Sequence, residues 1–211
     1  MATVSFPNID PDTVMNFEIN PGTILQLLET RPEKGPRLKC FEGSVTRVSP
    51  GRSHETSSSR LDLLIFAACQ EFGIERESLR STTWKLPAGF GDTAYEADYA
   101  YYIQSGGVAT SNPPPDLAVE VVVSHSEKKA LRAGALLKIP EIWVLDVTKH
   151  RLTFHPLVTR GKAKGAYRTE SKSRAFPFLN SADVLKRLDD PATGDMAFHE
   201  NCRAWARLLK G

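Results

Sequence analysis

Cysteine is scarce in this chain of 211 residues, which contains only Cys40, Cys69 and Cys202. The three are widely spaced, odd in number and form no CxxC pair. This pattern argues against a disulfide framework and against a zinc knuckle, because both need cysteines that come in pairs. We therefore expect a protein of a reducing compartment, namely the cytoplasm.

Long hydrophobic runs are missing as well. The longest run, Leu63 to Cys69, is far too short to cross a bilayer. The first residues, Met1 to Pro7, contain neither the basic stretch nor the apolar stretch of a secretory signal. We expect a soluble protein without a membrane segment.

The common nucleotide-binding and catalytic motifs are also absent. No GxGxxG or GxxxxGKS/T sequence follows a predicted strand, and the chain has no GxSxG or HExxH sequence. The usual dinucleotide-binding, P-loop, serine hydrolase and zinc protease classes are therefore not indicated. A net charge of +2 neither supports nor excludes nucleic-acid binding, because a local basic patch decides that property.

What the sequence does contain is a carboxylate inside a strongly apolar strand. The predicted strand Leu117–Val123 follows Pro113–Pro115 and has Glu120 in its middle. The valines around Glu120 imply burial on both faces, as in a central strand with helices above and below. Because a buried ionised group is costly unless something pairs with it, Glu120 requires a cation, a metal or a lysine nearby.

Strand periodicity places further acids near Glu120. Side chains two residues apart share a face, so Asp116 points the same way as Glu120. Upstream, the run Tyr95–Ile103 repeats the pattern, with Glu96 and Asp98 on one face. Four carboxylates that converge from two neighbouring strands would repel one another, and a hard divalent cation such as Mg²⁺ resolves that repulsion.

Each acid taken alone has a plainer interpretation. Asp116 can simply open the strand after the prolines, and Glu96 and Asp98 can lie on the solvated face of an edge strand. Glu120 does not fit such an interpretation, because its neighbours indicate burial on both sides. The combination therefore favours a functional site over a structural coincidence.

The order of predicted elements indicates an α/β domain with a central mixed sheet flanked by helices. We divide the chain into an N-terminal arm with a short helix (1–36), a core (37–180) and C-terminal helices packed on the core (181–211). The expected helices are 23–28, 54–72, 127–138, 182–188 and 196–209. The expected strands are 38–41, 44–48, 79–86, 95–103, 117–123, 142–147 and 151–158, and the basic segment 161–174 is expected to be a mobile hairpin or loop.

An ordered set of short motifs resembles one known family. The motifs are Phe41-Glu42-Gly43, Ser49-Pro50 with His54, Glu96-Ala97-Asp98, the stretch 114–122 and the stretch 140–146. In this order they resemble the Uma-two (Uma2) family of restriction endonucleases, which is similar to the PD-(D/E)xK nuclease fold. The resemblance covers roughly residues 20 to 180, and its most specific part runs from Pro114 to Asp146.

The resemblance implies roles for individual residues. Asp98 becomes the first catalytic acid, Glu120 the second and Asp116 a supporting acid, with His54 at the family's helix-start histidine. Asp98, Glu120 and the backbone carbonyl of Val121 would hold Mg²⁺ or Mn²⁺ for phosphodiester hydrolysis.

The resemblance also implies where the catalytic lysine lies. The usual lysine, two residues after the second acid, is absent because Val122 stands there. In the family the lysine lies on the following helix, where this chain has Lys128 and Lys129, and Lys129 is closer to the family register. The family would usually have an aromatic residue at Gly134 and a proline at His125. A solvated helix face is an alternative explanation for both lysines, as a structural histidine is for His54.

The implied partner is nucleic acid, with DNA preferred, and a homodimer is one assembly that the resemblance allows. A basic approach surface would come from Arg160, Lys162, Lys164, Arg168, Lys172 and Arg174. Two functions therefore stay open: a metal-dependent endonuclease, and a catalytically degenerate module of the same fold that binds nucleic acid or protein without cleavage.

Overall fold

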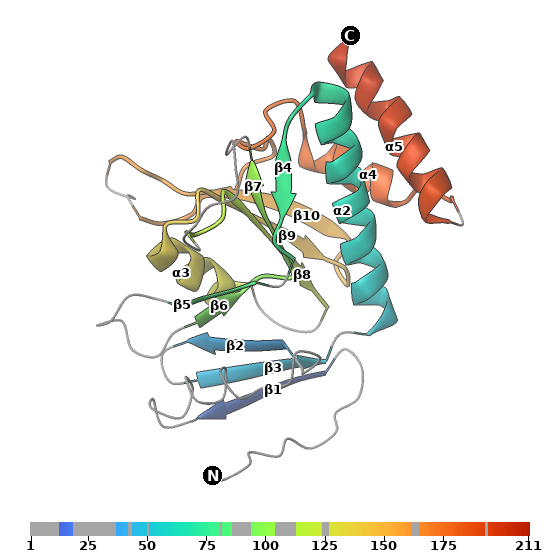
Figure 1. Cartoon of the computed structure of the whole chain (residues 1–211). Coiled ribbons are helices and arrows are strands. Elements are labelled where there is room, and N and C mark those ends of the chain that lie inside the picture. The colour runs from blue at the N-terminus through green and yellow to red at the C-terminus, as the bar shows by residue number, and fades with distance from the viewer. Residues whose placement is uncertain are drawn as a thin grey trace.

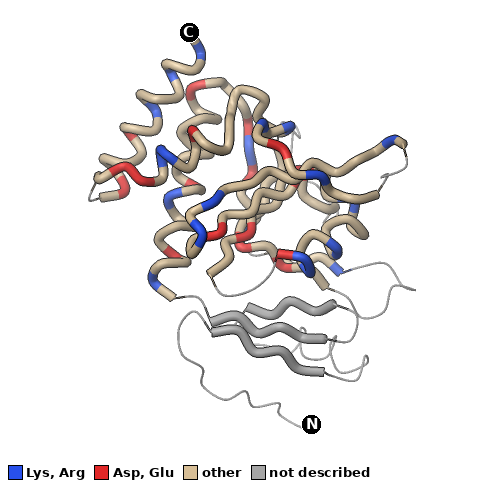
Figure 2. The backbone as a smooth tube through the Cα atoms, turned by 180° about the vertical axis from the view of Figure 1, so that it is seen from behind, with Lys and Arg blue, Asp and Glu red and all other residues tan. Residues whose placement is uncertain are grey.

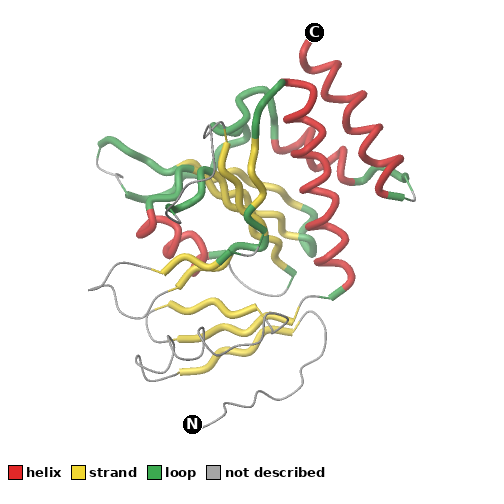
Figure 3. Tube along the Cα trace, in the orientation of Figure 1, coloured by secondary structure: helices red, strands yellow, loops and turns green. Residues whose placement is uncertain are grey.

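The structure is a computed structural model, which describes the chain in several ranges (Figure 3). Side chains are described for residues 51–80, 82–85, 94–103, 113–123, 127–161, 165–192 and 194–211. For three N-terminal strands only the backbone is described, namely β1 (Thr13–Glu18), β2 (Arg37–Phe41) and β3 (Ser44–Ser49). The predicted helix 23–28, the turn 87–91 and His125 lie outside the described residues.

The strands form two five-stranded sheets (Figure 1). The main sheet has the order β10-β9-β8-β7-β4, and the second sheet has the order β1-β3-β2-β6-β5. The main strands are β4 (Arg76–Ser78), β7 (Tyr99–Ile103), β8 (Leu117–Val122), β9 (Glu141–Asp146) and β10 (Arg151–Pro156). The second sheet is completed by β5 (Thr83–Lys85) and β6 (Ala94–Glu96).

Helices cover both faces of the main sheet, as the sequence predicts (Figure 1). Helix α2 (Arg52–Phe72) lies on one face together with α4 (Ser181–Leu188) and α5 (Asp195–Lys210). Helix α3 (Lys128–Leu137) lies on the other face. Because β8 and β9 are parallel, α3 is the crossover that connects them.

Helix α2 forms where the apolar spacing predicts it. Leu61, Leu64 and Ile65 are fully buried against the main sheet, while polar residues such as Glu55 and Gln70 are exposed. The helix ends at Gly73, whose φ of 67° is left-handed and whose N–H group bonds to Cys69 and Gln70 carbonyls. The predicted helix 54–72 is therefore confirmed, including its glycine stop.

Strand β8 occupies the centre of the main sheet, with every residue buried. It pairs antiparallel with β7 and parallel with β9. Leu117, Val119 and Val121 belong to the core on the α2 side, whereas Ala118 and Val122 belong to the core on the α3 side. By strand alternation Glu120 faces the α3 side, and the prediction of a central, doubly covered strand is confirmed.

Two predicted strands are wrong in extent. The segment 79–86 does not form one strand, because β4 ends at Ser78 and β5 begins at Thr83. The segment 95–103 is likewise divided into β6 and β7, which belong to different sheets. The chain crosses from one sheet to the other at both breaks, so Glu96 and Asp98 do not lie on one continuous strand face.

Other predicted elements agree with the structure. The expected strands 38–41 and 44–48 are confirmed, and β2 and β3 pair as a hairpin with Phe41 opposite Ser44. The predicted arm also contains strand β1, which pairs antiparallel with β3. The two C-terminal helices and the strand pair β9–β10 form as predicted. The division into arm, core and C-terminal helices stays a prediction.

The described part of the segment after β10 turns back along that strand. Glu170 forms an antiparallel bridge to Phe154 of β10, and Tyr167 forms one to Leu157 just after β10. The buried Glu141 carboxylate also holds the segment, because its Oε2 accepts the N–H groups of Arg174 and Ala175. These contacts agree with the hairpin, which is one of the two predicted possibilities for this segment, and the mobility of the segment stays a prediction.

Candidate active site

Asp98 lies at the crossing between β6 and β7 and is only 3% exposed. Its backbone N–H donates to Val119 of β8 at 3.1 Å, and its Oδ2 accepts the N–H group of Val121 at 2.6 Å. Tyr99 pairs with Val119 in the antiparallel β7–β8 ladder. If this register is continued by one residue, Asp98 lies opposite Glu120. The first and second predicted acids therefore belong to neighbouring positions of two paired strands.

Glu120 is fully buried on the α3 side of β8. Tyr95 of β6 lies beside it, and sequence reasoning did not single out this residue. Burial, with the negative charge of Glu120 as the next cause, holds the pKa of Tyr95 well above its ordinary value. The Tyr95 hydroxyl therefore stays protonated and neutral next to the carboxylate. Only its position in the acidic run 95–103 hinted at this contact.

His54 reaches the same acids from the first turn of α2. The ring is 2% exposed, and Nε2 lies 3.2 Å from Oδ2 of Asp98. Its Nδ1 lies 3.6 Å from the exposed carboxylate of Glu55. Asp98 is thus fixed from two sides, by the Val121 N–H group and by the His54 imidazole, and this arrangement can orient a reactive carboxylate.

Asp116 lies at the opposite end of β8. Its Oδ2 accepts the N–H group of Ile103 at 2.8 Å, and its own N–H group donates to Tyr101. Glu120 lies four residues further along the strand, which is roughly 13 Å at ~3.3 Å per residue. Asp116 therefore closes the β7–β8 ladder away from Glu120, and its role as a supporting acid stays a prediction.

Glu96 is buried in β6, within the second sheet, where it accepts a hydrogen bond from Thr83 of β5. Within the described ranges, no group of three or more His, Cys, Asp or Glu side chains is arranged to hold a metal ion. The remaining donor set is the Asp98 and Glu120 carboxylates with the carbonyl of Val121. These hard oxygen atoms fit Mg²⁺ or Mn²⁺, since protein Mg²⁺ sites commonly use only one or two carboxylates and complete the shell with water.

The start of α3 holds the lysines implied by the family resemblance. Lys128 is exposed, whereas Lys129 is partly buried beside the apolar face that Ala130 and Ala133 turn to the sheet. Val122, at the position of the fold's usual lysine, is 3% exposed and packs in the same core. The choice of Lys129 over Lys128, and the role of Lys129, stay predictions.

Gly134 departs from the family pattern for a steric reason. A Cβ atom there would lie 2.4 Å from Cδ1 of Ile142 and 3.0 Å from the Tyr167 hydroxyl. Tyr167, which donates a hydrogen bond to the carbonyl of Ile139, fills the space beside the helix. Any side chain larger than glycine at this position would therefore require Ile142 or Tyr167 to move.

Four residues of the predicted basic surface are described, and all four are exposed. Arg168 forms an ion pair with Glu170, and Arg174 donates to the carbonyl of Leu157. Arg160 and Lys172 are exposed, while Lys162 and Lys164 lie outside the described residues. Figure 2 shows that Lys and Arg are spread over several elements rather than gathered on this segment.

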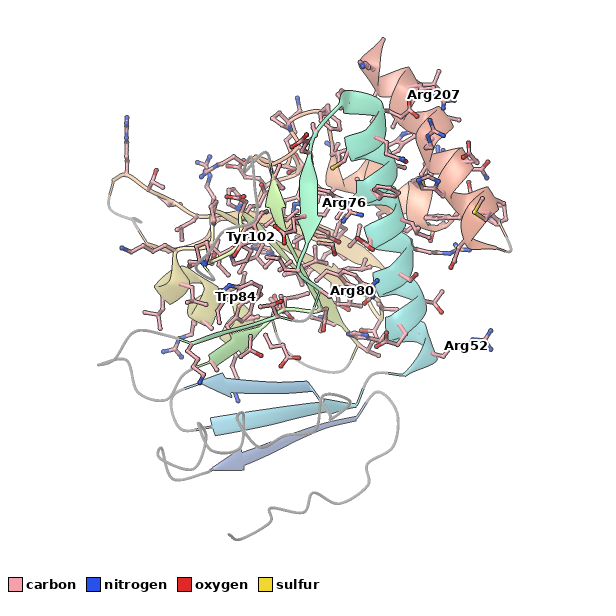
Figure 4. All side chains as sticks on the ribbon, in the orientation of Figure 1. Arg52, Arg76, Arg80, Trp84, Tyr102 and Arg207 are labelled. Atoms are coloured by element: carbon pink, nitrogen blue, oxygen red, sulfur yellow. The ribbon has the colours of Figure 1, made fainter. Side chains whose placement is uncertain are left out.

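Two of the tryptophans, Trp84 and Trp143, are core residues. Trp143 is fully buried against Phe154, and Trp84 is 2% exposed. The Trp84 ring N–H and the Tyr102 hydroxyl both donate to the Pro113 carbonyl, which fixes the start of the segment before β8 (Figure 4).

The mixed sheet, the helices on both faces and the paired acid-bearing strands define a restriction-endonuclease-like nuclease fold. A crystal structure described as "a putative nuclease belonging to DUF820" from Anabaena variabilis shares this fold with a TM-score of 0.54. It is 16% identical in sequence, and the match covers 78% of this chain and 98% of that chain.

Residues 24–188 match the Uma2 family, whose description is "Putative restriction endonuclease". The chain belongs to this family, which confirms the resemblance found in the sequence. No curated protein matches the chain. Among the helices that the structure describes, none has an apolar stretch long enough to cross a membrane.

Proposed function

We propose that this protein is a divalent-metal-dependent endonuclease that hydrolyses phosphodiester bonds of DNA. One observation carries the proposal: the buried Asp98, just before β7, accepts a hydrogen bond from the Val121 N–H group of the paired strand β8, directly beside the buried Glu120. Membership of the Uma2 family supports the reaction class. Mg²⁺ or Mn²⁺, DNA as the substrate, a cytoplasmic location and a homodimer remain predictions.

The contacts around Asp98 support the following proposed role for each residue. Asp98, Glu120 and the Val121 carbonyl would hold the divalent ion, which when bound supplies Lewis acidity toward the phosphoryl oxygen and a nucleophile from water near neutral pH. His54 keeps the Asp98 carboxylate oriented through its 3.2 Å contact. Lys129 would orient the attacking water or stabilise the charge that develops on the phosphoryl group.

A non-catalytic module of the same fold is the second candidate. Two observations favour it: Val122 is buried where the fold usually has its lysine, and the described residues contain no three-residue metal cluster. In that case the acids would bind a structural ion or none, and nucleic acid or a protein would bind without being cut.

A cleavage assay separates the two candidates. Labelled duplex DNA, single-stranded DNA and RNA are incubated with the protein in Mg²⁺, in Mn²⁺ and in EDTA. We expect metal-dependent cleavage of DNA that falls at least about 100-fold in Glu120→Gln, because this change keeps the shape but removes a charge that binds the ion. Glu75→Gln, which alters an exposed glutamate, is the matched control.

Cleavage that persists unchanged in Glu120→Gln would refute the proposed site. No cleavage of any substrate by the unmodified protein in either metal would favour the non-catalytic module.

A further inference from the structure

The chain crosses between the two sheets at two adjacent places. One crossing connects β6 to β7 and contains Asp98, and the other connects β4 to β5 and contains Arg80. In the main sheet Ser78 pairs with Tyr101, and the Leu79 N–H group extends the ladder by donating to Ala100. Continuing the antiparallel register of β4 and β7 by one more residue places Arg80 beside Tyr99, which directly follows Asp98 in the chain.

Arg80 has an unusual backbone conformation. Its φ of 46° is left-handed, which a residue with a Cβ atom adopts only at a cost. Among the described non-glycine residues only Lys138 and His150 share this property, and each has a local reason. Lys138 ends helix α3, and His150 lies in the tight turn between β9 and β10. Arg80 lies at neither a helix end nor a hairpin turn.

The side chain of Arg80 is available to a ligand. It is exposed, and no hydrogen bond, ion pair or ring contact joins its guanidinium to another described residue, as is also the case for Arg52 and Arg160. Many other arginines of the described chain are engaged by carbonyls or carboxylates, as are Arg60, Arg76, Arg187 and Arg203. Figure 4 shows Arg80 where β4 ends, on the side of helix α2.

This position lies at the rim of the buried acids. Paired strands are about 4.8 Å apart, so the Arg80 backbone stands close to the crossing that carries Asp98. His54, which holds Asp98, belongs to the first turn of the same helix α2. Two buried carboxylates repel a polyanion, and Val122 removes the cation that the fold usually places between them. A guanidinium at the rim offsets that repulsion.

We propose that Arg80 binds a backbone phosphate of the nucleic acid and thereby holds the strand to be cut against Asp98 and Glu120. This inference rests on the proposed function. The planar guanidinium donates two parallel hydrogen bonds to one phosphate, and it remains charged at every working pH. The left-handed conformation at Arg80 interrupts the extended strand there, where the chain leaves the β4–β7 ladder.

Binding, measured without cleavage, tests the proposal. Fluorescence anisotropy gives the Kd of a labelled DNA duplex in Ca²⁺ over a series of salt concentrations. We expect Arg80→Gln to raise Kd about tenfold and to reduce the slope of log Kd against log salt by about one, as for the loss of one phosphate contact. Arg80→Lys should keep the slope of log Kd against log salt but lose part of the affinity. The positive charge remains in this variant, whereas the two parallel hydrogen bonds of the guanidinium are lost.

Two further variants separate binding from folding. Lys186→Gln removes one positive charge from an exposed position on α4 and should change Kd by less than about twofold. Arg80→Gly relieves the left-handed conformation, so it should bind as weakly as Arg80→Gln while its Tm rises.

An Arg80→Gln protein with the Kd and salt slope of the unmodified protein would overturn the inference and leave the proposed function standing. If the unmodified protein binds neither DNA nor RNA at any salt concentration, both the inference and the proposed function are wrong.

Discussion

Two buried glutamates on neighbouring strands, Glu120 and Glu141, have different surroundings. Glu141 is 1% exposed, and its oxygens accept the Trp143 ring N–H and the backbone N–H groups of Arg174 and Ala175. It is a structural carboxylate that joins β9 to a later segment. Glu120 instead stands opposite a second acid. Burial alone therefore does not distinguish the candidate functional glutamate from the structural one. The charged groups around each carboxylate distinguish them.

At the same scale, Lys129 can be tested by removing its charge. We expect Lys129→Met to bind a divalent ion as the unmodified protein does, because the carboxylates remain, yet to lose about 100-fold or more in cleavage rate. Methionine keeps the length of the apolar stem on the partly buried side of α3. The exposed Lys128→Met is the matched control, and single-turnover cleavage is the measurement.

Full activity in the double variant Lys128→Met with Lys129→Met would show that neither lysine takes part. Loss of activity in Lys128→Met alone would reverse the choice between them.

At the scale of elements, Glu141 fixes the segment after β10 to the start of β9. Burial raises the pKa of this carboxyl above its ordinary value of 4.5, although the hydrogen bonds from Ala175 and Trp143 oppose the rise. Because the folded chain holds this proton more tightly than the unfolded chain does, the contribution to stability is complete below pH 4.5. It is lost as pH rises through the raised pKa.

We expect Glu141→Gln to lower the free energy of unfolding by about 1–3 kcal/mol, because the backbone donors of Arg174 and Ala175 lose a charged acceptor. The variant should also lack the decline in stability with rising pH described above. Urea unfolding from pH 4.5 upward measures both effects, with Glu75→Gln as the control. A parallel pH dependence in the two variants would contradict this account of Glu141.

The elements that the sequence predicts well are those decided by local pattern. Helix α2 has an apolar stripe and a glycine stop, and β8 has valines around one acid, so both were predicted within a few residues. The break at Asp98 was not predicted, because alternation continues from Tyr95 to Ile103. Which half joins which sheet depends on strands β2 and β8, far away in the chain.

The residues of the candidate site also fall into those that the sequence predicts and those that it does not. Asp98 and Glu120 were predicted as a pair from strand faces and family motifs, and the ladder places them opposite each other. The placement of Asp116 with them was not supported, because distance along a strand and a hydrogen bond to Ile103 decide its position. Tyr95 and Arg80 gave no local signal, since their importance comes from contacts and conformation in the folded chain.

At the scale of the whole molecule, the acids occupy the junction of two sheets. The main sheet supplies Glu120 and the second sheet supplies Tyr95, while Asp98 lies on the crossing between them. Helix α2 adds His54 from its first turn. The site therefore forms only when both sheets and α2 are in place, and a rearrangement of any of them would disturb it.

The central claim is that Asp98 and Glu120 form one divalent-metal centre, and a titration with Mn²⁺ tests it most directly. Calorimetry or electron paramagnetic resonance should detect one bound ion in the unmodified protein and in Glu75→Gln. The account predicts that Asp98→Asn and Glu120→Gln each abolish this binding while the circular dichroism spectrum is preserved. Unchanged Mn²⁺ binding in both variants would contradict it.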